Sequence, residues 1–259
     1  GLPWNPPMAT NPAAPAPLTD VLRAVTTTLV DAGVPSPGVD AELLVGHVLG
    51  LGRGELVAAA LRGATASAAD LSAVAGLVGR RAAREPLQHL TGTAAFRHLD
   101  LRVGPGVFVP RPETEVVAQL AIDALRAAAG PAPIAVDLGT GSGAIALALA
   151  TEVPHARVHA AERSPEAFAW AERNVAAHAP HVRLVLADLA DAFGDLDGTV
   201  SVVVSNPPYV PDDAVPRDPE VRDWDPPAAL YGGADGLDVV RTLSHVGLRL
   251  LHPGGALVL

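Results

Sequence analysis

The sequence has 259 residues, which is long enough for two modest domains that each bury a hydrophobic core. Its formal net charge of −10 argues against broad binding to nucleic-acid phosphates, and the absence of cysteine excludes disulfides, thiolate nucleophiles and cysteine-ligated metals. No apolar run approaches the roughly 20 residues that span a bilayer, and no secretory signal is visible. We therefore expect a soluble, cytoplasmic protein that binds neither nucleic acid nor a membrane.

The first part of the chain predicts a small all-helical domain. Residues 1–17 are rich in proline and alanine, and Gly1–Pro7 before Met8 resembles a remnant of a cloning vector, so we expect this segment to be disordered. From Leu18 onward, apolar residues at helical spacing alternate with glycine-rich turns. Helices are expected from Leu18 to the stop at Gly33, and over 39–49, 53–61 and 68–84. We assign residues 18–90 to this domain, which could serve as scaffold or as docking surface.

A β-hairpin linker is predicted over residues 91–110. Ala95–Val103 alternates like one strand of a hairpin, and Gly104–Gly106 is expected to turn it. Phe108 then stands before a proline-rich corner, where we expect it to form one wall of a ligand pocket. A helix follows from about Glu113. Glu115, in its first turn, either complements the helix dipole or belongs to the site; the sequence leaves both open.

A glycine loop marks the first strand of the remaining domain, residues 111–259. The apolar strand Ile134–Leu138 runs into Gly139 and Gly141, and a helix is predicted from Ala144. This spacing also satisfies the dinucleotide pattern, so a nicotinamide enzyme has to be considered. Asp137 argues against it, because a carboxylate two residues before the first glycine could instead pair with a ligand's ammonium group.

Two further strands are predicted to end in carboxylates. Glu162 ends the strand from Val158 and lies where an acidic residue meets a ribose diol in open α/β sheets. Asp188 ends the strand from Val182 and could accept a hydrogen bond from an adenine amino group. A lone acid at a strand end is usually a helix cap or a turn residue, so neither is strong alone. Three acids at successive strand ends beside a glycine loop together predict a pocket for S-adenosylmethionine.

A fourth strand end is chemically unusual. The buried-type strand Val200–Ser205 is followed by Asn206, Pro207, Pro208 and Tyr209. The Asn206 amide oxygen and the Pro207 carbonyl could accept both N–H groups of a planar NH2, while Tyr209 holds its plane. Asn-Pro-Pro alone is often only a turn. Placed beside a methyl-donor pocket, it predicts methylation of an amide or amino nitrogen, with no metal and no dedicated general base.

In these segments the chain resembles the release-factor glutamine methyltransferase family, from about Ala41 to the last residue. The resemblance is carried by Phe108–Glu115, Asp137–Ala146, Asn206–Tyr209, Glu85–Gly92 and Gly232–Leu237. It implies an α/β fold: a Rossmann-like class I methyltransferase sheet with a small N-terminal all-helical domain and a linking β-hairpin. It further implies methyl transfer from S-adenosylmethionine, leaving S-adenosylhomocysteine, to the glutamine N5 of the Gly-Gly-Gln loop in peptide chain release factors. The helical domain would dock this protein substrate, and we expect a monomer that acts in translation termination.

Pattern and resemblance together assign the site residues. Catalysis is expected from Asn206, Pro207 and Tyr209, and substrate binding from these residues and Pro208. Cofactor binding is expected from Phe108, Asp137, Gly139, Thr140, Gly141, Ser142, Gly143, Glu162, Asp188, Leu189 and Asn206.

The chain departs from the family in two places, and two other functions stay open. It stops at Leu259, inside the expected fifth strand, and Leu189 stands where some relatives have an aromatic residue, which gives the adenine an aliphatic wall. An adenine-N6 DNA methyltransferase uses a similar loop, but it needs a basic channel that this acidic chain does not indicate. A cofactor-binding protein without catalysis is the other alternative.

Overall fold

The computed structural model describes residues 14–259, which fall into two compact units that divide between Gly92 and Thr93. Most of the segment for which we expect disorder, residues 1–13, lies outside the described residues. The last part of that expectation is wrong. Strand β1 (Ala16–Pro17) pairs antiparallel with β2 (Thr65–Ala66), and Ala16 is buried. The two residues before the first helix are therefore held in place by their pairing with β2 and by the burial of Ala16.

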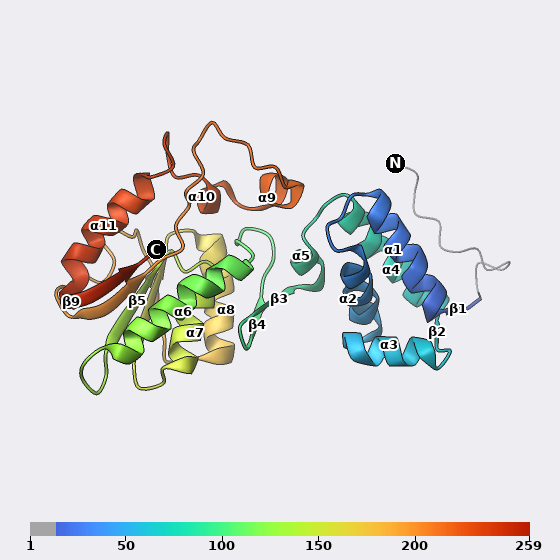
Figure 1. Cartoon of the computed structure of the whole chain (residues 1–259), viewed down its shortest axis with the longest axis horizontal. Helices are drawn as coiled ribbons and strands as arrows, with labels where there is room; N and C mark the ends of the chain where they lie inside the picture. Colours follow the sequence, from blue (N-terminus) through green and yellow to red (C-terminus); the bar gives the residue numbers. More distant parts are fainter. Residues whose placement is uncertain (1–13) are drawn as a thin grey trace. The chain divides into compact units, whose positions relative to one another are not determined.

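The first unit is helical, as predicted (Figure 1). Its helices are α1 (Leu18–Asp31), α2 (Pro37–Leu49), α3 (Arg53–Leu61), α4 (Ala68–Ala82) and the short α5 (Leu87–Thr91). Their apolar faces form one core, and Arg81 on α4 reaches Asp40 on α2 in a buried ion pair of 2.8 Å. In the described part of the chain, no single helix is long and apolar enough to cross a membrane; α2 and α3 pass that test only when taken together across an 87° bend.

The linking hairpin is present, but its turn is not where the sequence indicates. Strand β3 (Thr93–Phe96) pairs antiparallel with β4 (Leu99–Arg102), so the chain reverses at Arg97 and not at Gly104–Gly106. Arg97 adopts a positive φ of 53°, which is uncommon for a residue with a side chain. Side-chain bonds hold it there: its guanidinium binds Glu152 at 2.6 and 2.7 Å, and its backbone N–H donates to Glu115 at 2.8 Å.

The second unit carries a five-stranded, fully parallel sheet of order β7-β6-β5-β8-β9. Its strands are β5 (Ile134–Leu138), β6 (Arg157–Glu162), β7 (Arg183–Leu186), β8 (Val200–Val204) and β9 (Leu251–Val258). The helices are α6 (Pro112–Ala127), α7 (Ala144–Glu152), α8 (Pro165–His178), α9 (Pro219–Trp224), α10 (Pro227–Leu230) and α11 (Asp238–Leu250), with a 3₁₀ turn at Gly194–Leu196. The predicted α/β class, with a parallel sheet and an N-terminal helical unit, is confirmed.

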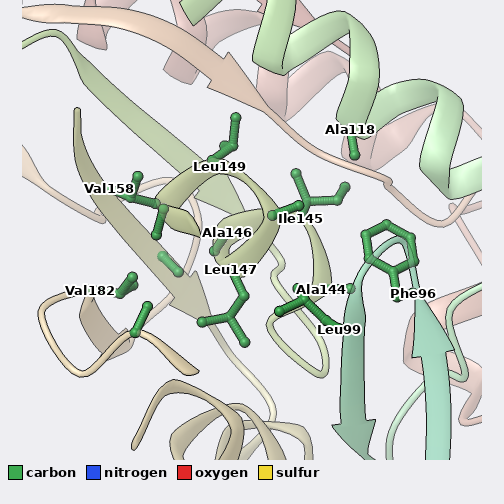
Figure 2. Close-up of a cluster of buried hydrophobic side chains, with 14 of the residues drawn as sticks. Phe96, Leu99, Ala118, Ala144, Ile145, Ala146, Leu147, Leu149, Val158 and Val182 are labelled. Carbon is green, nitrogen blue, oxygen red and sulfur yellow. The ribbon is translucent and has the colours of Figure 1, made fainter. Parts of the chain in front are cut away.

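Helices cover both faces of the sheet. Buried residues of α6, α7 and α8 share one core with the hairpin, whereas Leu243, Val246 and Leu250 of α11 pack with the other face. Figure 2 shows the first core, in which Ile145 and Leu147 of α7 belong to the same cluster of buried side chains as Phe96 of the hairpin. Residues Ala144–Ala150 are all buried, which explains why this helix is apolar on every side.

Candidate active site

The site lies where the strand order changes direction. The chain runs outward from β5 through β6 to β7, then returns to place β8 on the other side of β5. In open α/β sheets a crevice forms at the carboxyl ends of the strands at such a point. A cavity of about 770 Å³ occurs at this place, a volume typical of sites for cofactor-sized molecules. Its walls include Phe108, Asp137, Gly139, Thr140, Gly141, Ser142, Glu162, Leu189, Asn206, Pro207, Pro208 and Tyr209.

The glycine loop after β5 takes a shape that needs glycine. Gly139, Gly141 and Gly143 have φ values of 73°, 59° and 89°, in the left-handed region that a side chain disfavours. The N–H groups of Gly139 and Thr140 donate to the Ala161 carbonyl at 2.9 and 3.0 Å, which fixes the loop to β6. Gly143 caps α7 and is the one loop glycine that does not line the cavity. The loop therefore presents bare backbone to the cavity.

Asp137 is buried on the cavity wall with one free acceptor atom. Its Oδ2 accepts hydrogen bonds from the Thr140 hydroxyl at 2.6 Å and the Ala146 N–H at 3.1 Å, while its Oδ1 has no partner among the described residues. Burial raises the pKa of Asp137 to about 7, although these two hydrogen bonds oppose the rise. A buried carboxylate oxygen without a partner is costly, so the site fits a ligand that brings a cation or a donor to it.

Glu162 ends β6 and holds the glycine loop. Its Oε2 accepts the Gly141 N–H at 2.9 Å, and its Oε1 accepts the N–H groups of Arg163 and Ser164 at 2.8 and 2.9 Å. Each carboxylate oxygen can accept more than one hydrogen bond, so the side chain still has capacity for a ligand hydroxyl. The sequence indicated a ligand contact at Glu162 but not this second task.

The third predicted carboxylate does not line the cavity. Strand β7 ends at Leu186, two residues earlier than expected, and Asp188 is exposed. Its Oδ1 accepts the Ala190 N–H at 2.9 Å, the local turn that short acidic side chains often make. Leu189 is buried and does line the cavity. Asp188 is thus the sequence neighbour of a cavity-lining residue but does not line the cavity itself.

The Asn206–Tyr209 loop follows β8 and forms the opposite wall. The Asn206 Nδ2 donates to the Thr114 hydroxyl on α6 at 3.2 Å, and Pro207 and Pro208 line the cavity. Tyr209 is 69% exposed, so its ring lies at the mouth. The Ser205 hydroxyl donates to the Leu138 carbonyl at 2.6 Å, which joins the start of this loop to the end of β5. The Asn206 side chain and the glycine loop therefore line the same cavity.

A glycine-rich turn supports the Asn206–Tyr209 loop from behind. A Cβ built on Gly232 would lie 2.7 Å from the Pro208 carbonyl oxygen, and one on Gly236 would lie 2.3 Å from that of Tyr209. No side chain fits at such distances, and Gly236 also has a φ of 79°. This close approach explains the Gly232–Leu237 segment that the sequence singled out.

The proline-rich segment with Phe108 and Arg111 links the cavity wall to the residue after α9. Phe108 lines the cavity, and the Arg111 guanidinium lies 4.9 Å from the centre of its ring. Arg111 also forms an ion pair of 2.6 Å with Asp225, the residue that follows α9. Burial raises the pKa of Asp225 to about 6, although the charge of Arg111 opposes the rise. Glu115, which the sequence left open, binds the hairpin turn at Arg97. It does not line the cavity.

Sequence reasoning missed two polar residues at the site. Thr114 is buried beside Asn206 within the family-like segment Phe108–Glu115, yet only the fold brings them together across 92 residues. Asn174 on α8 is fully buried: its Oδ1 accepts the Arg102 N–H at 2.7 Å, and its Nδ2 donates to the carbonyls of Arg102 and Ser142 at 2.9 and 2.8 Å. A polar residue within the amphipathic pattern of α8 was the only available signal for Asn174.

Comparison with known proteins gives the chain close relatives. Residues 20–92 match the PrmC N-terminal domain, and residues 98–218 match the methyltransferase small domain. The release factor glutamine methyltransferase of Streptomyces coelicolor is 53% identical over 93% of this chain and 83% of its own length. The protein of the same name from Bifidobacterium longum is 43% identical over 93% of this chain and 86% of its own length. A 4-amino-L-phenylalanine/4-methylamino-L-phenylalanine methyltransferase of Streptomyces pristinaespiralis is 42% identical over 70% of this chain and 63% of its own length.

Proposed function

The chain belongs to the release factor glutamine methyltransferase family, and from this premise we propose that it methylates the N5 nitrogen of the Gly-Gly-Gln glutamine in peptide chain release factors. It is a methyltransferase that depends on S-adenosylmethionine. The observation that carries the proposal is that Asn206 and the glycine loop line the same cavity. On this proposal the enzyme is a cytoplasmic monomer that binds no nucleic acid, and residues 18–90 dock the release factor.

We assign each part of the cofactor to a different residue at the strand ends. When bound, S-adenosylmethionine supplies a methyl group on an electrophilic sulfonium. We assign the ammonium group of its methionine part to Asp137, whose Oδ1 has no other partner in the described structure, and the ribose hydroxyls to Glu162. Leu189 would provide an apolar wall for the adenine and Phe108 would close the methionine end, since both line the cavity. Asp188 keeps no assigned role, because it is exposed and does not line the cavity.

Asn206 and Pro207 position the glutamine amide. A glutamine nitrogen is a poor nucleophile because its lone pair is delocalised into the carbonyl. The Asn206 Oδ1 and the Pro207 carbonyl each accept one N–H of that amide, which aims the nitrogen and stabilises the positive charge that develops on it. Correct alignment of two reacting groups lowers a barrier by up to about 7–11 kcal/mol in favourable systems. Once the nitrogen carries the methyl group its proton is acidic, so this account needs no dedicated base.

Two other acceptors compete with the release factor. The Streptomyces pristinaespiralis relative is named for an aromatic amine, so a small amino acid bearing an aryl amino group is the second candidate. An adenine in DNA is the third, and the net charge of −10 weighs against it because DNA binding relies on clustered basic residues. A planar NH2 group is common to all three acceptors.

Labelled methyl transfer distinguishes these acceptors. The protein is incubated with S-adenosylmethionine carrying a labelled methyl group and, in parallel, with folded release factor, the Gly-Gly-Gln loop peptide, 4-amino-L-phenylalanine or duplex DNA. We expect label in the folded release factor, and much slower labelling of the peptide, since binding energy far from the reacting atoms then contributes to the rate. Faster labelling of the small amine or of DNA would contradict the proposal.

A further inference from the structure

Among residues 14–259, the hydroxyl of Thr114 is the one hydrogen-bond partner recorded for the Asn206 side chain. Thr114 lies in the first turn of α6, 6% exposed, and its Oγ1 accepts a hydrogen bond from the Asn206 Nδ2 at 3.2 Å. Both residues line the cavity. The threonine backbone is fixed independently, because its N–H donates to the Arg111 carbonyl at 3.0 Å. The threonine therefore stands in a fixed place, with its hydroxyl accepting from the amide of Asn206.

An asparagine side chain is almost symmetric in shape but not in chemistry. Rotation of its amide by half a turn exchanges an acceptor oxygen for a donor NH2 in nearly the same space. Only one orientation suits an incoming amide NH2, since the other opposes donor to donor. In the structure the Nδ2 of Asn206 donates to the Thr114 hydroxyl, and this bond leaves Oδ1 on the side of the amide away from Thr114.

We propose that Thr114 is a positioning residue for methyl transfer: its hydroxyl holds the Asn206 amide in the orientation in which Oδ1 accepts from the substrate nitrogen. The proposal deepens the proposed function and rests on the role assigned there to Asn206. It also gives a physical reason for a threonine in the first turn of α6, directly after the prolines of the Phe108–Glu115 segment. On this proposal Thr114 acts through Asn206 and not on the reacting atoms.

The kinetic test compares Thr114→Val, which keeps the shape and removes the hydroxyl, with Thr114→Ser, which keeps the hydroxyl. Removal of one hydrogen bond of this kind should lower kcat about tenfold, and serine should restore most of it. The KM for release factor and the affinity for S-adenosylhomocysteine should stay within about twofold. Thr242→Val is the matched control, because the Thr242 hydroxyl bonds only the Asp238 carbonyl of its own helix among the recorded contacts. Equal loss in the valine and serine variants would overturn the proposal, since packing would then explain both.

A double mutant shows whether Thr114 acts through Asn206. If it does, Thr114→Val should slow an Asn206→Ala enzyme no further. An additional tenfold loss in that background would assign Thr114 a different task and overturn the proposal.

A final measurement needs no acceptor at all. Hydrogen exchange of the Asn206 side-chain NH2, followed by NMR, should be about tenfold faster in Thr114→Val than in the wild type or in Thr114→Ser, because the protecting bond is lost. Unchanged exchange would overturn the proposal. A wild-type enzyme that labels no release factor would instead refute the proposed function, while this exchange measurement still decides the contact.

Discussion

The backbone N–H of Gly141 donates to the Glu162 carboxylate at 2.9 Å, so the side chain that we assign to the ribose also holds the tip of the glycine loop. The second carboxylate oxygen accepts the N–H groups of Arg163 and Ser164. One carboxylate thus organises two backbone segments around the cavity. Loss of the carboxylate should disturb both the ligand contact and the loop.

Glu162→Ala should weaken cofactor binding much more than it slows the loaded enzyme. Hydrogen bonds to a charged group are worth about 1.5–3 kcal/mol each, and about 1.4 kcal/mol corresponds to a factor of ten in affinity. We expect the Kd for S-adenosylhomocysteine, measured by calorimetry, to rise at least about tenfold. Glu172→Ala, an exposed acid on α8, is the control and should leave the Kd unchanged. An unaltered Kd in Glu162→Ala would remove Glu162 from the binding site.

Asp137 should make the free energy of unfolding depend on pH. The pKa of Asp137 is raised from 3.8 to about 7 in the folded protein, chiefly by burial. Between these values the unfolded chain has released the proton that the folded chain keeps, so stability falls as pH rises from about 4 to about 7. Asp137→Asn cannot ionise and should unfold at higher denaturant concentration than the wild type at about pH 8. Equal midpoints at that pH would contradict the raised pKa.

The same group should give cofactor binding the opposite pH dependence. A ligand ammonium group favours ionised Asp137, so binding releases a proton below about pH 7 and the affinity for S-adenosylhomocysteine increases from about pH 5.5 to about pH 7.5. Calorimetry in buffers of different ionisation enthalpy measures this proton. Asp137→Asn should abolish the release. Asp225→Asn is the control for the second buried acid, whose pKa is raised to about 6, and should keep it.

Asn174 should be a stability determinant that acts on the glycine loop. Asn174→Asp replaces the buried NH2 with an oxygen that faces the carbonyls of Arg102 and Ser142. An unpaired buried polar group costs about 1–3 kcal/mol, and a charged one costs more. We expect a loss of at least about 2 kcal/mol in the free energy of unfolding at pH 7.5, measured with urea. The loss should shrink at about pH 4.5, where a protonated aspartic acid can donate again. A loss that does not depend on pH would contradict this account.

The repeating patterns of the sequence predict most of the fold. Continuous apolar runs such as Val200–Val204 become buried parallel strands, and the glycines after β5 take the left-handed conformations that their type indicates. The hairpin was misplaced because Gly104–Gly106 carries the stronger turn signal. The actual turn depends on Arg97, whose positive φ is held by Glu152 and Glu115 from distant parts of the chain.

The sequence likewise predicts some residues of the site and not others. Asp137 and Glu162 lie at the ends of β5 and β6, and Asn206 lies two residues after β8, so strand prediction alone brings them to one edge of the sheet. The contact expected of Asp188 stays a prediction: β7 ends two residues before it, and its side chain accepts the N–H of Ala190 in its own turn. Thr114 contacts a residue 92 positions away in the sequence, and the partners of Asn174 are at least 32 positions away, so no local pattern predicts these contacts.

Asn206→Ala should separate chemistry from cofactor binding. Loss of one oriented hydrogen-bonding group in a transition state typically costs about 2.7–4 kcal/mol, a factor of about 100 to 1,000 in kcat. The affinity for S-adenosylhomocysteine should stay within a few-fold, because Asp137 and Glu162 lie on other strand ends. Turnover and calorimetry on one preparation test both statements. Turnover above about a tenth of the wild-type rate would contradict the role assigned to Asn206.

The central claim is the identity of the methylated atom. The most direct test is to treat folded release factor with the wild-type protein and S-adenosylmethionine, digest the product, and locate the added methyl group by fragmentation mass spectrometry. The account predicts a single methyl group on the side-chain nitrogen of the glutamine in the Gly-Gly-Gln loop. A methyl group on any other residue, or an unmodified release factor under conditions in which an amino acid or a DNA adenine is methylated, would contradict it.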